Sequence, residues 1–188
     1  NLPDERETLI GALAGPSHPL SWLAKRETQM GFYDAKGVVQ SLLSKLRVKV
    51  AFEASQEASL VPGRSAMIIC NGQPIGIVGE MHPRILARFN LTEAPLAIFE
   101  IDLPKLLESA PKAGRGYVSP SRFPDSTRDI ALVVNIEISS AQLEEIILQH
   151  KMVQHVVPFD VFTGQDVPLG KKSIAYEIVF QSNKDTLT

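Results

Sequence analysis

Glycine, lysine and serine come together at 170–173 (GKKS), where they resemble the end of a phosphate-binding loop. Such a loop needs a glycine, four residues, and then Gly-Lys-Ser/Thr leading into a helix. Here five residues separate Gly164 from Gly170, and Lys172 stands between Lys171 and Ser173. The run that follows is typical of a strand, not of a helix. The spacing therefore argues against a nucleotide site in this loop.

Other residue types capable of chemistry are scattered along the chain. The histidines, His18, His82, His150 and His155, have no spacing that places two of them on one helical face to hold a metal. Cys70 is the single cysteine, which excludes an internal disulfide and a multi-cysteine zinc site. Spacing singles out no nucleophile with its base. We therefore predict no catalytic residue and no metal site, and we expect His82 to be a turn or capping residue.

The stretch 158–180 consists of two β-prone runs joined by a loop with glycine and proline, which predicts a hairpin. Because side chains alternate between the two faces of a strand, Asp160 and Phe162 share one face. Ser173 points away from the apolar row of the return strand. That row consists of Ile174, Tyr176, Ile178 and Phe180.

The apolar face of this hairpin must be covered, whereas the face with Asp160, Phe162 and Ser173 could stay open. An aromatic ring beside small polar groups on an open sheet can stack on an RNA base and hydrogen-bond it. An ordinary half-solvated sheet face is the alternative interpretation, and the residues alone leave both open.

Hydrophobic periodicity predicts further elements on both sides of a segment rich in proline, glycine and basic residues at 111–120. Before it we expect helices that begin at Asp34, Pro83 and Asp102, and a tight turn at Asn71–Gly72. The strands expected in this part lie at 9–14, 48–52, 66–70, 74–79 and 96–101. After the segment come a strand at 129–134, apolar on both faces and therefore expected to be central, and a helix opened by the capping box Ser139–Gln142. With the hairpin, this order is most of a βαββαβ ferredoxin-like unit.

Composition restricts the class of function. The 188 residues are 44% hydrophobic and 21% charged, with a net charge of −2. Residues 118–188 hold six basic and nine acidic side chains, which argues against non-specific nucleic-acid binding and permits a small, specific contact. No apolar run approaches membrane-spanning length, and the single cysteine agrees with a reducing, cytoplasmic compartment. We therefore expect neither a DNA nor a membrane partner.

Several blocks resemble the C-terminal part of the β subunit of bacterial phenylalanine–tRNA ligases, in the family's order. They are FYDAKGVVQSLL (32–43), VPGRSAMI (61–68), IGIVGEMHPRIL (75–86), FEIDLPKLL (99–107), SRFPDSTRDIALVV (121–134), FDVFTG (159–164) and GKKSIAYEIVF (170–180). The resemblance implies an α+β chain in which an antiparallel-sheet module of the class II synthetase type precedes an incomplete ferredoxin-like βαββαβ domain. Residues 1–107 would be part of the inactive catalytic-like module and 108–120 a linker. Residues 121–188 would be the ferredoxin-fold anticodon-binding domain, without its last helix and strand.

The resemblance also implies partners and site residues. Asp160, Phe162 and Ser173 match the family's base-contacting positions and would bind the anticodon region of the phenylalanine tRNA. Basic side chains that could touch the RNA backbone are Arg122, Arg128, Lys171 and Lys172. The first module would pack on the catalytic α subunit in a heterotetrameric enzyme. That enzyme uses ATP and Mg²⁺, and this part of it would bind neither.

Three departures from the family pattern bear on this interpretation. The stretch LAIFEIDLPKLL (96–107) has no glycine and no arginine, whereas a working site of this class has both. Phe162 stands where the family commonly has tyrosine, which keeps a stacking ring without a phenolic hydrogen bond. Val61 stands where the family commonly has histidine. The competing hypothesis is a ferredoxin-like module that binds an effector or a protein without RNA contact.

Overall fold

A computed structural model describes residues 5–18, 21, 28–91, 94–111, 119, 121–164 and 167–182. The chain divides into two compact units, Asn1–Arg115 and Gly116–Thr188. Most of the predicted linker at 108–120 and the C-terminal residues 183–188 lie outside the described residues, so the domain bounds stay a prediction. The predicted α+β class with antiparallel sheets is confirmed.

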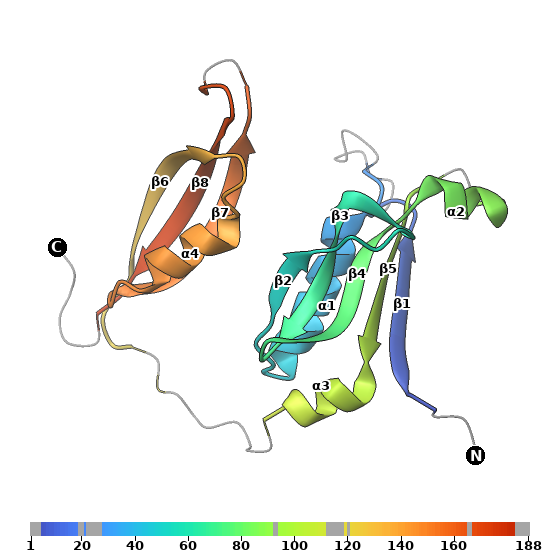
Figure 1. Ribbon diagram of the computed structural model, residues 1–188. Coiled ribbons are helices and arrows are strands. Elements are labelled where there is room, and N and C mark those ends of the chain that lie inside the picture. The colour runs from blue at the N-terminus through green and yellow to red at the C-terminus, as the bar shows by residue number, and fades with distance from the viewer. Residues whose placement is uncertain are drawn as a thin grey trace. The chain divides into compact units, whose positions relative to one another are not determined.

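Unit 1 is built on a five-stranded antiparallel sheet with one long helix against it (Figure 1). The strands, in sheet order, are β1 (Thr8–Ala14), β5 (Leu96–Asp102), β4 (Gln73–Met81), β3 (Leu60–Cys70) and β2 (Ala51–Ala54). The helices are α1 (Phe32–Lys45), α2 (Pro83–Arg88) and α3 (Leu103–Ser109). Val39 and Leu43 of α1 are buried against Ile68, Val78 and Ile101 of the sheet. Their removal from water is the main stabilising term of this unit.

Local signals explain most of the ends of these elements. Asn71 and Gly72 both have positive φ, as expected for the predicted tight turn between β3 and β4. His82 caps α2 by accepting the Arg84 backbone N–H at Nδ1 (3.2 Å), which confirms the expected capping role. Asp102 caps α3 in the same way, through the Lys105 N–H (3.0 Å).

Two predictions in unit 1 are wrong in detail. Asp34 does not begin α1: the helix begins at Phe32, and Asp34 lies in its first turn, where its carboxylate accepts the Gly31 N–H at 2.8 Å. The carboxylate therefore completes the cap from inside the helix. The strand expected at 48–52 lies at 51–54, because Val48 is a core residue after the helix instead.

Gly76 marks a close approach between β4 and β5. A Cβ added there would lie 2.3 Å from the Glu100 carbonyl oxygen, which is backbone and cannot rotate away. We expect Gly76→Ala to destabilise unit 1 by about 1–3 kcal/mol, the usual cost of overpacking. At Gly37, inside α1, an added Cβ would meet no atom within 4 Å apart from its chain neighbours and the backbone of its own helix. Gly37→Ala should therefore stabilise by about 1 kcal/mol, and amide exchange of β4 and β5 in the two variants should move in opposite directions.

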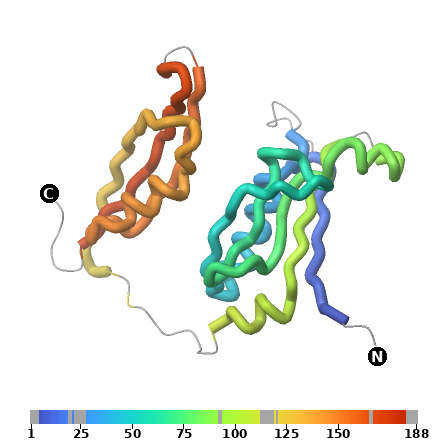
Figure 2. The backbone as a smooth tube through the Cα atoms, viewed as in Figure 1, coloured from blue at the N-terminus to red at the C-terminus, as the bar shows by residue number. Residues whose placement is uncertain are grey.

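Unit 2 contains β6 (Ser126–Asn135), α4 (Ser140–Leu148), β7 (Val153–Phe162) and β8 (Lys171–Phe180). Their strand order is β6-β8-β7, with both pairs antiparallel. This is the arrangement of a ferredoxin-like βαββ segment, in which the hairpin places its second strand between the two strands joined by the helix. Figure 2 shows α4 running along this sheet. The predicted capping box is present, because Ser139 N donates to Gln142 Oε1 (2.8 Å) and Gln142 N to Ser139 Oγ (3.3 Å).

Among the described strands β6 lies at an edge of the sheet and β8 is central. The fourth strand of a complete βαββαβ unit would pair with β6, and residues 183–188 lie outside the described residues, so the central position expected for 129–134 stays a prediction. Ile130 and Leu132 of β6 face the core, whereas Ala131 and Val133 are exposed on the other face. The apolar residues on both faces of this strand suggested burial on both, but α4 covers only one. The predicted apolar row of β8 is confirmed, with Ile174, Tyr176 and Ile178 buried and Phe180 packed against them.

Candidate functional site

The strand register gathers the three predicted base-contacting residues on the face of the sheet away from the core. Phe162 of β7 lies directly opposite Ser173 of β8, and Asp160 lies opposite Ala175. Directly paired residues of antiparallel strands share a face, and this face is opposite the one that buries Ile174 and Tyr176. The phenyl ring of Phe162 remains 46% exposed. An aromatic ring, a hydroxyl and a carboxylate are therefore available side by side on one surface.

The loop after β7 shapes the position of the Phe162 ring. A Cβ added at Gly164 would lie 2.5 Å from the tip of this ring, so the ring rests against the glycine backbone. The register also shifts between Pro158 and Asp160, which leaves Phe159 as the extra residue of a bulge. Bulges redirect side chains near functional sites. Here the bulge lies immediately before the segment that carries Asp160 and Phe162.

The same face is acidic at its centre. Asp129 of β6 lies directly opposite Glu177 of β8, one row along from the Ala175–Asp160 pair. Like charges in directly opposed positions are unfavourable, and all three carboxylates are exposed. This surface repels phosphate, but it accepts hydrogen bonds from N–H groups.

The four basic residues suggested for the RNA backbone do not form one patch. Lys171 pairs with Asn135 and shares the face of Ser173, whereas Lys172 pairs with Val134, a residue that packs against the core. Arg128 pairs with Ile178 near the opposite end of β8, and its guanidinium donates to the Thr127 carbonyl (2.9 Å). Arg122 precedes β6 and is exposed. Of the four, only Lys171 lies at the loop end of the candidate face.

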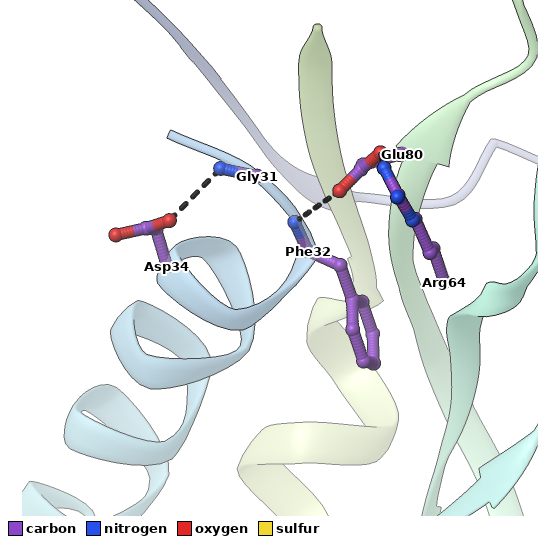
Figure 3. A network of polar contacts seen from close by, with 5 residues as sticks. All are labelled: Gly31, Phe32, Asp34, Arg64 and Glu80. Carbon is purple, nitrogen blue, oxygen red and sulfur yellow. Dashed lines mark hydrogen bonds and ion pairs between the residues drawn. The ribbon is translucent and has the colours of Figure 1, made fainter. Parts of the chain in front are cut away.

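Unit 1 contains a polar network that we did not predict from the sequence (Figure 3). Glu80 is only 8% exposed. Its Oε1 accepts the Phe32 backbone N–H at the start of α1 (3.0 Å), and its Oε2 accepts from Arg64 Nη1 (2.9 Å). The hydrogen bond to Glu80 raises the pKa of the Arg64 guanidinium. A signal was present in the sequence: Glu80 is in phase with the buried Val78, and a buried carboxylate requires a partner.

Two searches of the described residues gave negative results. No cluster of three or more histidine, cysteine, aspartate or glutamate side chains there could hold a metal ion. No helix within these ranges is long and apolar enough to span a membrane.

The strand order and helix of unit 2 define a domain of the ferredoxin-like type, and residues 121–188 match the family model described as ferredoxin-fold anticodon binding domain. Residues 1–103 match the model described as the phenylalanyl tRNA synthetase β chain CLM domain. The chain therefore belongs to the phenylalanyl-tRNA synthetase β chain family, and the resemblance noted from the sequence blocks is confirmed.

Curated relatives agree with this assignment. Over 187 residues the chain is 37% identical to the phenylalanine–tRNA ligase β subunit of Dehalococcoides mccartyi. It is 38% identical over 192 residues to that of Staphylococcus epidermidis and 35% identical over 191 residues to that of Listeria monocytogenes. Each match covers 100% of this chain and 23% of the relative. The chain therefore spans about a quarter of the length of these relatives.

Proposed function

We propose that this chain is the non-catalytic part of the β subunit of a phenylalanine–tRNA ligase, working in the cytoplasm. Unit 2 holds the anticodon region of the phenylalanine tRNA, and unit 1 packs on the catalytic α subunit. The assembled enzyme charges the tRNA with phenylalanine and uses ATP and Mg²⁺ at the α subunit. The observation that carries the proposal is the placement of Phe162 directly opposite Ser173, with Asp160 on the same uncovered face.

The chemistry of this face favours bases over phosphates. An exposed phenyl ring stacks on a base of any identity, while the Ser173 hydroxyl and the Asp160 carboxylate accept hydrogen bonds from base N–H groups. The opposed Asp129 and Glu177 keep the RNA backbone away from the middle of the sheet. Backbone contacts are then confined to its margin, where Lys171 lies. Such a surface selects splayed, single-stranded nucleotides, as an anticodon loop presents them.

The residues of unit 1 support a non-catalytic role. In the stretch 96–107 the single cation is Lys105. Its Nζ donates to the Pro74 carbonyl (3.2 Å) and lies 3.9 Å from Asp102 Oδ2. ATP chemistry needs cations aimed at the phosphates, and this lysine instead bonds the backbone at the start of β4. Unit 1 therefore supports the active site of its partner and has none of its own at this position.

The expected result is that the 188-residue chain alone catalyses no phenylalanine-dependent ATP–pyrophosphate exchange. Exchange should appear when the α subunit and the remainder of the β subunit are added, and the chain should co-purify with the α subunit, with tRNA, or with both. Exchange by the chain alone would contradict the proposal. Capture of neither partner under conditions where the complete enzyme assembles would favour the effector- or protein-binding alternative.

A further inference from the structure

Unit 1 contains a cavity of about 580 Å³ that neither the anticodon face nor the packing of the sheet against α1 uses. It lies where the ends of β3 and β4 meet α2 and the segment that follows α2. Its walls include Val61, Met81, Leu86 and Leu91, and its polar side chains include Arg64 and Glu80. A cavity of this size with mostly apolar walls and a few convergent polar groups has the features of a small-molecule site.

Arg64 is paired with a buried carboxylate beside this cavity. Its Nη1 donates to Glu80 Oε2, and the other oxygen of that buried carboxylate accepts the Phe32 N–H (Figure 3). A Cβ on Gly31 would lie 2.7 Å from Glu80 Oε1, so the glycine leaves space for the carboxylate in this position. The Arg64 side chain nevertheless remains 64% exposed. The guanidinium is thus fixed at one nitrogen and open at the others.

The open donors determine what chemistry the site accepts. A guanidinium carries five N–H donors in a planar fork, and among the described residues the side chain bonds only Glu80. Two parallel N–H groups of such a fork match the two oxygens of a carboxylate. Glu80 already compensates the charge of Arg64, so a singly charged carboxylate brings less uncompensated negative charge to the apolar walls than a phosphate would, and a ligand cation would meet the guanidinium. His82, which also borders the cavity, already accepts a hydrogen bond through Nδ1.

We propose that this cavity binds a small carboxylic acid with an apolar body. The carboxylate takes the free edge of Arg64, and the body lies against Val61, Leu86 and Leu91. Glu80 is a positioning residue, because it orients Arg64 through the start of α1. This site is separate from the anticodon face and goes beyond the proposed function, since neither charging nor anticodon binding requires it.

The test is calorimetric titration of the 188-residue chain with 3-phenylpropionate and with 3-phenylpropanamide. The two probes have the same apolar body, but the amide lacks the negative charge and the second acceptor oxygen. We expect the acid to bind in one-to-one stoichiometry and the amide to bind at least tenfold more weakly. Absence of binding by the acid, or equal binding of acid and amide, would overturn the proposal.

Two variants locate the binding. Val61→Trp places a large ring on the wall that the apolar body is proposed to contact and leaves the Arg64–Glu80 pair intact, so it should weaken binding of 3-phenylpropionate at least tenfold. Arg64→Lys keeps the charge but removes the fork, and should weaken binding at least tenfold. Arg84→Lys is the matched control, because Arg84 is exposed and lies outside the walls of this cavity, and it should bind like the parent chain. Amide exchange of α1 and β4 reports folding of each variant, and unchanged binding by a folded Val61→Trp or Arg64→Lys chain would contradict the assignment.

Discussion

Replacing Tyr176 with alanine should unfold unit 2 and leave unit 1 intact. Tyr176 is fully buried in the central strand β8, where its ring forms the core together with Ile174 and Ile178. Loss of a buried aromatic ring costs about 3–5 kcal/mol. The total stability of a domain is about 5–15 kcal/mol, and a unit of this size lies near the lower end. Amide exchange is the suitable measurement: β6 and β8 should lose their protection, while β4 and β5 of unit 1 should keep theirs.

Tyr176→Phe separates the ring from its hydroxyl. The Ser140 hydroxyl donates to Glu144 (2.7 Å). The Tyr176 hydroxyl donates its one proton to Ser140 at the start of α4, where Oγ lies 3.0 Å away and the carbonyl oxygen 3.3 Å away. Loss of this one hydrogen bond should cost about 1 kcal/mol, so the phenylalanine variant should stay folded. If the alanine variant also retained full protection, the core of unit 2 would not depend on this ring.

The stability of unit 2 should also depend on pH through Tyr176, because burial raises the pKa of this residue above its ordinary value. A group with a raised folded-state pKa contributes stability below its unfolded pKa, which is about 10 for tyrosine. That contribution is lost as the pH rises through the folded-state value. The parent chain should therefore lose stability in unit 2 on strongly alkaline titration. In Tyr176→Phe this loss should be smaller, and equal losses in both chains would assign it to other groups.

Features that depend on a few neighbouring residues could be predicted from the sequence. The Ser139–Gln142 capping box, the turn at Asn71–Gly72 and the face shared by Asp160 and Phe162 all follow from local chemistry or from strand alternation. These features form regardless of how the rest of the chain folds, because the residues that produce them are neighbours in the sequence. The base contacts of Asp160, Phe162 and Ser173 remain a prediction, although the strand register does bring these three residues onto one face.

Features that depend on distant pairing could not be predicted in this way. Glu80 reaches a backbone N–H 48 positions earlier in the chain, and only the docking of α1 on the sheet creates that contact. The opposition of Asp129 and Glu177 depends on the register between β6 and β8, which neither strand specifies alone. Whether β6 lies at an edge of the sheet depends on which other strands pair with it. The negative charge at the centre of the candidate face could therefore be recognised only once the pairing of the strands was known.

Replacing Phe162 with alanine in the assembled enzyme should weaken tRNA binding by about 1–3 kcal/mol, the usual contribution of one aromatic–base stack. This corresponds to a loss of affinity of roughly five- to 150-fold. Phe162 lies at the end of β7 beside the loop, is half-exposed and is absent from the core of unit 2, so the unit should stay folded. Phenylalanine-dependent pyrophosphate exchange should be unchanged, because the proposed function places amino-acid activation at the α subunit. Phe162→Tyr should be tolerated, since the ring is retained.

Phe159→Ala is the matched control for this experiment. Phe159 is also an exposed phenylalanine of β7 (58%), but it is the bulged residue and has no paired position on the face of Ser173. Its loss removes a similar apolar area without removing the proposed stack, so tRNA affinity should change little. A larger effect at Phe159 than at Phe162 would contradict the assignment of the stack to Phe162. Equal loss of tRNA binding and of amino-acid activation in Phe162→Ala would instead show that Phe162 maintains the fold, because a stacking residue affects only the RNA.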